Sequence, residues 1–138
     1  MQTTIATFKR ILALSFLAAA TLVLTSPLMA QETITPIITH ALAAAPGSEA
    51  LMYTVDFPPG FSSSIHRHDA QVSVYVLEGS VVMQVKGGKE LTLGPGQSFY
   101  ENPNDIHVVS RNASSSKPAK FLVFLIHKKG TPLVIPVK

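Results

Sequence analysis

The sequence predicts an all-β protein with a single folded domain, either a β-sandwich or a small β-barrel. Apolar and alternating runs are short, and Gly, Pro and Asn turn signals separate them at spacings of roughly 8–12 residues. Beyond residue 30 no run has the 3.6-residue apolar period of an amphipathic helix. A chain of this length is expected to form one domain rather than two.

The first half of the domain predicts an edge strand, an alternating strand and a segment that carries two histidines. The first strand is expected at 34–43, where Pro36 indicates an edge because proline cannot donate to a sheet ladder. The next is expected at 49–57, where apolar and polar residues alternate. The histidine-bearing region is expected to form strands at 63–68 and 72–77.

The second half predicts a hairpin followed by a closing series of strands. Gly87 and Gly88 are typical of a tight hairpin turn. The segment 120–127 is strongly apolar, β-branched or aromatic, so we expect it to lie in the middle of a sheet. The expected strands are 80–86, 90–93, 98–101, 106–110, 120–127 and 133–137.

Residues 1–30 are predicted to be a secretory signal peptide, which leaves residues 31–138 as the folded domain. Lys9 and Arg10 provide a basic start, and the apolar segment 11–24 is shorter than the roughly 20 residues of a membrane-spanning helix. Ala30 supplies a small residue at the expected cleavage point. The mature protein is therefore expected to be periplasmic or secreted and free of the membrane, with an uncleaved anchor as the alternative.

Composition argues against nucleic-acid binding and disulfide bonding. The sequence has 11 Lys and Arg and 8 Asp and Glu, and two of the basic residues, Lys9 and Arg10, belong to the signal segment. The remaining basic residues are scattered near turns and form no stripe with aromatic residues, so no nucleic-acid partner is expected. The sequence has no cysteine, although an exported protein is free to form disulfides.

Three of the five histidines point to a metal site. Side chains on one face of a β-strand recur every second residue, so His66 and His68 are expected to point the same way. His107 occurs later in a similar setting, and imidazole is a common ligand of divalent transition metals. His40 and His127 do not belong to this group and are expected to be surface or hydrogen-bonded histidines.

The segments 60–79 and 94–107 resemble the two sequence motifs of the cupin family. In the first, Gly60 is followed after five residues by the His-x-His pair and ends at Gly79; the second begins Gly-Pro-Gly and ends at His107. The resemblance covers most of residues 47–137. It implies a single-domain cupin jelly-roll β-barrel over 31–138, with one divalent metal held by residues of both motifs. Cupins often dimerise, so a homodimer is expected, with 34–43 as a candidate contact strand.

The resemblance implies His66, His68 and His107 as metal ligands but leaves the fourth ligand open. Val72 stands where the first cupin motif usually has Glu, and an isopropyl group cannot coordinate a cation. Two residues are candidates to replace it. Gln71 is adjacent but on the opposite strand face, whereas Glu101 shares a face with Phe99 and would point inward if Phe99 does.

Glu101 is therefore expected either to be a metal ligand, directly or through water, or to act as a catalytic acid or base. A carboxylate inside a barrel is unfavourable unless it is paired or near a cation. A solvated Glu at a strand end is the simpler alternative.

The second motif departs from the cupin pattern in other places. Asn102 and Asn104 replace the usual Pro and Gly, and Arg111 stands where the final Asn usually lies. Asn is well suited to turns, so these changes are compatible with the same loop.

These observations favour a metal-dependent, oxygenase-type enzyme of dioxygenase-like chemistry acting on a small organic substrate. Three histidines and at most one carboxylate leave coordination positions open, and Val72, Val74 and Val76 would make the pocket apolar. The metal is one divalent transition ion: Fe, Mn, Ni, Zn or Cu. A non-catalytic module that binds or senses a metal or small ligand is one alternative, and a metal-dependent isomerase or lyase is another.

Overall fold

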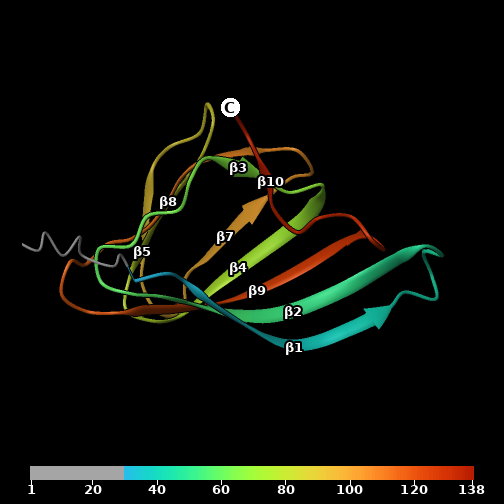
Figure 1. Ribbon diagram of the computed structural model, residues 1–138, viewed down its shortest axis with the longest axis horizontal. Coiled ribbons are helices and arrows are strands. Elements are labelled where there is room, and N and C mark those ends of the chain that lie inside the picture. Colours follow the sequence, from blue (N-terminus) through green and yellow to red (C-terminus); the bar gives the residue numbers. More distant parts are fainter. Residues whose placement is uncertain (1–29) are drawn as a thin grey trace, which may run out of the picture.

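A computed structural model describes residues 30–138, which fold entirely into strands and loops (Figure 1). The signal peptide expected at residues 1–30 lies, apart from Ala30, outside the described residues. None of the described residues forms a helix that is long and apolar enough to cross a membrane. The strands are β1 (Thr33–Ala41), β2 (Ser48–Phe57), β3 (His66–Arg67), β4 (Ala70–Glu78), β5 (Val81–Val85), β6 (Leu91–Leu93), β7 (Ser98–Glu101), β8 (Ile106–Asn112), β9 (Ala119–Lys128) and β10 (Ile135–Pro136).

The strands form two antiparallel sheets that face each other, as expected for a jelly-roll barrel. One sheet has the order β1-β2-β9-β4-β7 and the other β10-β3-β8-β5-β6 (Figure 1). The expectation of a central strand at 120–127 is confirmed, because β9 lies between β2 and β4. The expectation of an edge strand is confirmed as well, since β1 pairs only with β2 and its register shifts between Pro36 and Ile38.

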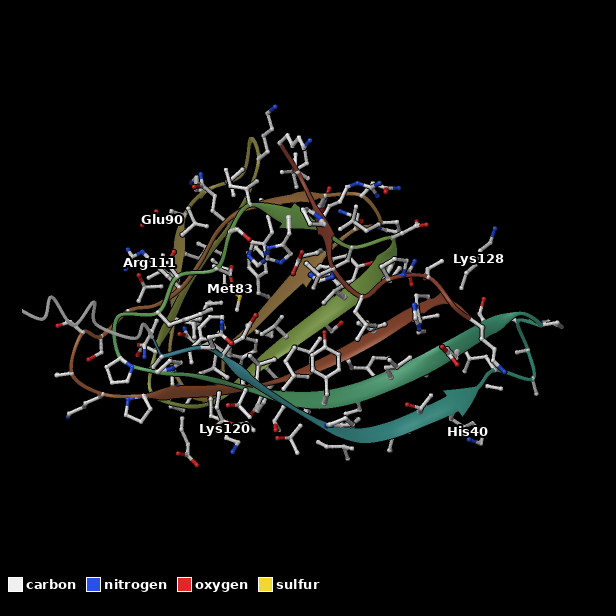
Figure 2. The ribbon with its side chains drawn as sticks, in the orientation of Figure 1. His40, Met83, Glu90, Arg111, Lys120 and Lys128 are labelled. Carbon is white, nitrogen blue, oxygen red and sulfur yellow. The ribbon has the colours of Figure 1, made fainter. Side chains whose placement is uncertain are left out.

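The core lies between the two sheets and is built from alternate residues of their inner faces. In β4 every second residue from Ala70 to Val76 is buried, while the residues between them are exposed. The inner face of β9 alternates in the same way. Met83 projects inward from the opposite sheet, whereas Lys120 and Lys128 lie on the outside (Figure 2).

The histidine-bearing segment is less regular than the sequence predicts. A strand was expected over 63–68, but β3 comprises only His66 and Arg67, and β4 begins at Ala70. The segment before β3 still follows β8, through a bridge from Ser62 to Arg111 and a hydrogen bond from the Ser63 amide to the Ser110 carbonyl (2.9 Å). The cause is that this stretch contacts β8 only at intervals, so no continuous ladder forms.

The asparagines near the second motif take over the roles of the missing residues. Asn104 adopts a positive φ of 69°, a conformation that favours Gly but that Asn tolerates. Asn112, one residue after Arg111, is buried, and its side-chain amide donates to the carbonyls of Phe57, Pro58 and Lys117 at 2.8–3.2 Å. The amide thereby closes the loop end of the barrel from a position shifted by one residue.

Gly79, the last residue of the first motif, fits a place where no side chain can be accommodated. Its φ is +67°, and a Cβ there would lie 2.4 Å from the Pro118 carbonyl oxygen and 2.8 Å from Ala119 Cα. The turn after β4 therefore packs directly on the entry to β9.

We predict that Gly79→Ala destabilises the fold more than Gly87→Ala. Both glycines have positive φ, so both variants have backbone strain of about 1–3 kcal/mol, but a Cβ on Gly87 meets nothing within 4 Å. Overpacking against backbone should add about 1–3 kcal/mol at Gly79 alone. Urea unfolding of the two variants measures the difference, and equal midpoints would contradict the close approach.

Candidate metal centre

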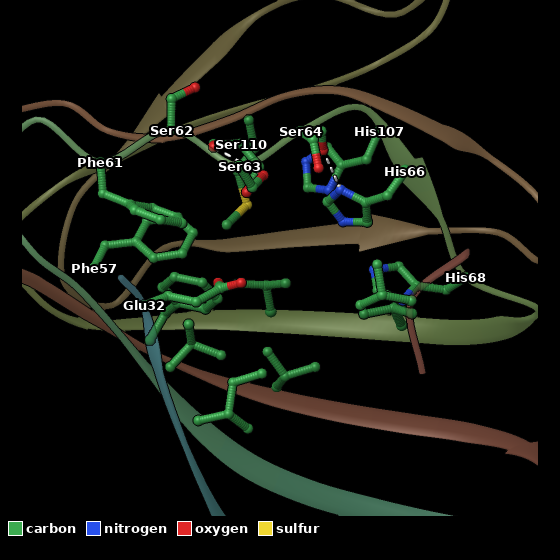
Figure 3. A pocket seen from close by; sticks show the side chains of 18 of the residues that line it. Glu32, Phe57, Phe61, Ser62, Ser63, Ser64, His66, His68, His107 and Ser110 are labelled. Carbon is green, nitrogen blue, oxygen red and sulfur yellow. Dashed lines mark hydrogen bonds between the residues drawn. The ribbon is translucent and has the colours of Figure 1, made fainter. Parts of the chain in front are cut away.

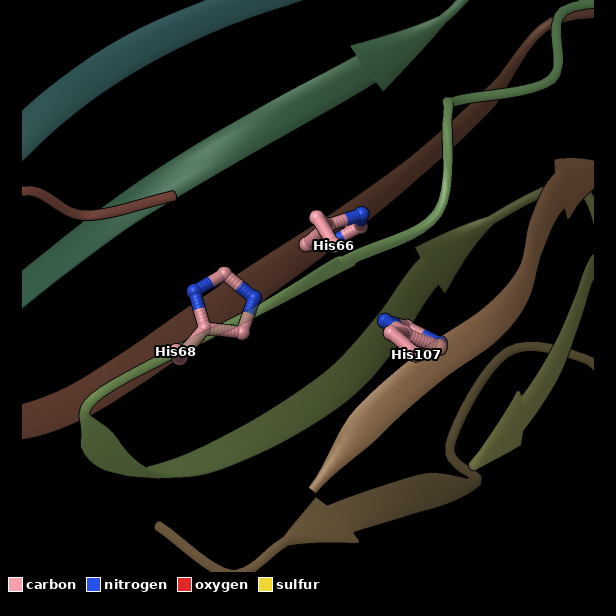
Figure 4. A group of neighbouring side chains, drawn as sticks. All are labelled: His66, His68 and His107. Carbon is pink, nitrogen blue, oxygen red and sulfur yellow. The ribbon is translucent and has the colours of Figure 1, made fainter. Parts of the chain in front are cut away.

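The pairing of β3 with β8 brings the three motif histidines together. His66 lies directly opposite His107 in this ladder, and His68 follows two residues later (Figure 4). The ring centroids of His66 lie 5.0 Å from His68 and 5.2 Å from His107. All three side chains are buried, and one ring nitrogen from each lies within 4.8 Å of the others, so the trio can hold a metal ion.

The hydrogen bonds of these histidines leave a lone pair on each ring for a metal. His66 Nδ1 lies 2.7 Å from the Ser64 carbonyl oxygen, and His68 Nδ1 contacts the Leu133 carbonyl oxygen. A carbonyl only accepts, so each Nδ1 carries the proton and each Nε2 is a free acceptor. His107 Nδ1 lies 3.6 Å from Glu101 Oε1, and its buried Nε2 has no hydrogen-bond partner within the described part of the chain.

The electrostatics of the cluster favour neutral imidazoles. Burial, together with the nearby His66 and His68, lowers the pKa of His107 from 6.5 to about 3. Burial also lowers the pKa of His68, against the opposing effect of its bond to Leu133. Metals bind the neutral form of histidine, so these side chains are ready to coordinate without losing a proton.

Glu101 lies beside the histidine trio, as its strand face predicts. It is 2% exposed, and it pairs directly with Val72 in the β4–β7 ladder. A carboxylate thus enters the barrel from the strand next to the position that lacks the usual Glu. Burial raises the pKa of Glu101 from 4.5 to about 7, and Asp105 adds to the rise. Its Oε2 has no hydrogen-bond partner among residues 30–138.

The other candidate for the missing ligand points away from the site. Gln71 is exposed on the outer face of β4, because successive side chains of a strand alternate and Val72 occupies the inner position. Glu101 is therefore the carboxylate near the trio, although it lies next to the group of mutually close nitrogens rather than within it.

The histidines and Glu101 form one wall of a cavity of about 560 Å³ between the sheets. Figure 3 shows the histidines at one end of this cavity and Phe57, Phe61 and Glu32 at the other. Val72 and Val74 line the cavity as expected, whereas Val76 is buried deeper in the core. The apolar lining consists of Ile34, Tyr53, Val55, Phe57, Phe61, Val72, Val74, Met83, Phe121, Val123 and Val134.

Three contributors to the site were not expected from the sequence. Glu32 precedes β1, and the pKa of its carboxyl is raised by burial at the cavity wall. Burial, then Glu101 and Glu32, raise the pKa of Tyr53, so its phenol stays protonated. The Leu133 carbonyl that holds His68 is a backbone group, which no side-chain pattern reveals.

The remaining histidines behave as expected. His40 is exposed on β1. His127 is buried, and its two ring nitrogens contact Thr131 Oγ1 at 2.9 Å and Glu49 Oε1 at 3.1 Å. Neither residue lines the cavity.

Comparison with known proteins agrees with this architecture. Residues 53–125 match the family model of the cupin domain, Cupin_2. The chain belongs to the cupin family. The cupin-domain-containing oxidoreductase srdB of Neurospora crassa is 34% identical over 87 residues, which are 59% of this chain and 39% of that protein. This cupin therefore spans about two fifths of that relative's length.

Solved structures show the same fold at low sequence identity. The DMSP lyase DddQ from Ruegeria pomeroyi DSS-3 has a TM-score of 0.61 and 20% identity, over 83% of this cupin and 55% of that chain. A Klebsiella pneumoniae protein with a double-stranded β-helix domain has a TM-score of 0.60 and 16% identity, over 83% of this cupin and 86% of that chain.

We predict that the histidine trio holds one divalent metal ion per chain. His66→Ala and His107→Ala should each weaken binding by at least about 100-fold, because losing a ligand costs more than losing an outer-shell partner. His40→Ala is the matched control, since His40 is exposed. Titration of metal-depleted protein with Mn(II), Ni(II) and Zn(II) measures the affinity. Stoichiometric metal in both ligand variants would refute the assignment.

Proposed function

We propose that this cupin is a metal-dependent oxidoreductase of the oxygenase type that acts on a small organic molecule. The observation that carries the proposal is the position of three buried histidines and a buried carboxylate on one wall of a largely apolar cavity. The oxidoreductase named among its relatives supports the reaction class. His66, His68 and His107 would hold the metal, with Glu101 at its side.

Each group in the cavity has a distinct task in this proposal. A divalent metal, when bound, supplies Lewis-acid and redox chemistry. The surrounding Val72, Val74 and Phe57 exclude water, which strengthens electrostatic interactions with the substrate. The imidazoles of His66 and His68 keep fixed orientations because their Nδ1 groups donate to backbone carbonyls.

Glu101 completes the site in one of two ways that its position allows. Its Oε2 has no hydrogen-bond partner among residues 30–138 and it lies beside His107, which supports a role as a fourth ligand. It also lines the cavity, so it is placed to exchange a proton with a bound substrate.

The shape of the cavity favours a substrate with two unlike ends. Phe57, Phe61 and Phe121 provide an aromatic region, while the histidine end offers a polar anchor. A phenol or diketone, with oxygen atoms on an apolar body, would place its oxygens at the histidines and its carbon skeleton against the aromatic rings.

We expect oxygen uptake when the metal-loaded protein is mixed with such a substrate. Fe(II)-, Mn(II)-, Ni(II)- and Cu(II)-loaded samples are tested with phenols, flavonoids and diketones, and oxygen consumption is followed with an electrode. Conversion without oxygen uptake would instead indicate an isomerase or lyase. Tight retention of a ligand without any conversion would indicate a binding module.

Metal titration combined with the oxygen-uptake assay separates the two roles of Glu101. If Glu101 is a ligand, Glu101→Gln weakens metal binding by at least about 10-fold. If it transfers a proton, the variant keeps its metal but loses about 100-fold or more in turnover. Glu78→Gln is the matched control because Glu78 is exposed at the end of β4. Full activity in Glu101→Gln would exclude both roles.

We also propose that the protein is exported and dimeric, as the basic and apolar segment before Ala30 and the exposure of β1 support. All of β1 is exposed, including Ile34, Ile37 and Ile38, so a second copy has apolar surface to cover. Native mass spectrometry of protein from the bacterial periplasm should give a dimer of chains that begin at residue 31. A full-length chain mass would contradict cleavage, and a monomer at micromolar concentration would contradict dimerisation.

A further inference from the structure

We propose that the last residues of the chain form a strap that positions His68, and that His127 and Thr131 anchor this strap. The C-terminal strap is defined here as residues 128–138. The inference rests on the proposed metal site, because positioning His68 matters for function only if His68 is a ligand. Thr131 and His127 are positioning residues: neither lines the cavity, and both act through the strap.

The base of the strap is held by a partly buried cluster around His127. His127 is 6% exposed at the end of β9, and its imidazole bridges Thr131 Oγ1 (2.9 Å) and Glu49 Oε1 (3.1 Å). The Thr131 hydroxyl donates to the Lys128 carbonyl at 2.8 Å, which closes a turn. The Lys129 amide adds a bond to the Gly47 carbonyl at 3.0 Å. The direction in which the chain leaves β9 is therefore fixed by side-chain and backbone hydrogen bonds together.

From this base the strap runs along the segment that carries the histidines. Two residues after Thr131, the Leu133 carbonyl accepts the Nδ1 proton of His68. Ile135 and Pro136 then pair with Arg67 and His66 in a two-residue ladder, and the Val137 amide donates to the Ile65 carbonyl at 3.2 Å. The ribbon shows β10 lying alongside β3 (Figure 1).

His68 depends on this strap in a way that the other two histidines do not. His66 is oriented by the Ser64 carbonyl, two residues away, and His107 lies beside Glu101, which belongs to β7 of the opposite sheet. His68 lies outside the β3 ladder, and its Nδ1 partner is 65 residues away in the sequence. Among the hydrogen bonds of residues 30–138, the Leu133 carbonyl is the partner of His68 Nδ1, and no second acceptor contacts this nitrogen.

The strap itself is weakly attached beyond its base. Most of residues 128–138 are exposed or only partly buried, and β10 contributes just the short ladder to β3. Segments with few buried contacts and exposed hydrogen bonds open locally at low free energy. The partly buried contact between His127 and Thr131 is therefore the contact whose loss should increase the opening of the strap most.

The test uses Thr131→Val, which removes the hydroxyl and keeps the side-chain shape. We expect metal affinity to fall by about 10–100-fold, as for other partners that orient a metal-binding histidine. Thr131→Ser restores the hydroxyl and should bind metal like the wild type. Thr39→Val, on the exposed strand β1, is the matched control for the substitution itself.

A second readout needs no metal. In the metal-free wild type, the His68 Nδ1 proton should exchange slowly by NMR because Leu133 accepts it, and the Val137 amide should be protected. Both protections should decrease in Thr131→Val. Unchanged protection or wild-type metal affinity in that variant would overturn the inference. If the wild type binds no metal but loses protection in the variant, the strap is supported and the proposed function fails.

Discussion

The cross-strand pair of His66 and His107 is the contact on which the rest of this site depends. Buried nitrogens must find a partner, and an unpaired buried polar atom is unfavourable by about 1–3 kcal/mol. The protein satisfies the Nδ1 atoms of His66 and His68 with backbone carbonyls and brings one ring nitrogen of each of the three histidines within 4.8 Å of the others. Because burial lowers the pKa of His107 and its Nε2 has no hydrogen-bond partner among residues 30–138, a cation would satisfy this arrangement.

The pairing of Val72 with Glu101 explains how a cupin can lack the usual glutamate and still present a carboxylate. Directly paired residues in antiparallel strands have Cβ atoms about 4.5–5.5 Å apart. A carboxylate on β7 therefore enters nearly the same space as one on β4 would. The exchange leaves an isopropyl group on β4, which makes that side of the cavity more apolar. The acid lies beside His107, with 3.6 Å between Glu101 Oε1 and His107 Nδ1.

Much of this architecture follows from local sequence pattern, and the exceptions have a physical cause. The alternation of apolar and polar residues was sufficient to predict β4, β7 and the inward direction of Glu101, because one buried face sets the register. The motif spacing identified the histidine trio. The brevity of β3, the shifted role of Asn112 and the carbonyl of Leu133 were not predictable in this way. Each depends on contacts with backbone groups of segments far away in the sequence, and a backbone group carries no side-chain signal.

The residues that line the cavity differ in how firmly the chain holds them. His107 and Glu101 belong to strands paired within the sheets, so their positions are tied to the stability of the whole fold. Glu32 and Val134 come from segments near the two ends of the described chain, and His68 lies just outside β3, where the Leu133 carbonyl accepts its Nδ1 proton. The orientation of one histidine thus depends on a lightly attached segment of the chain. The histidine trio therefore combines an imidazole whose position follows the stability of the sheets, that of His107, with an imidazole whose orientation can change when the C-terminal strap opens locally, that of His68.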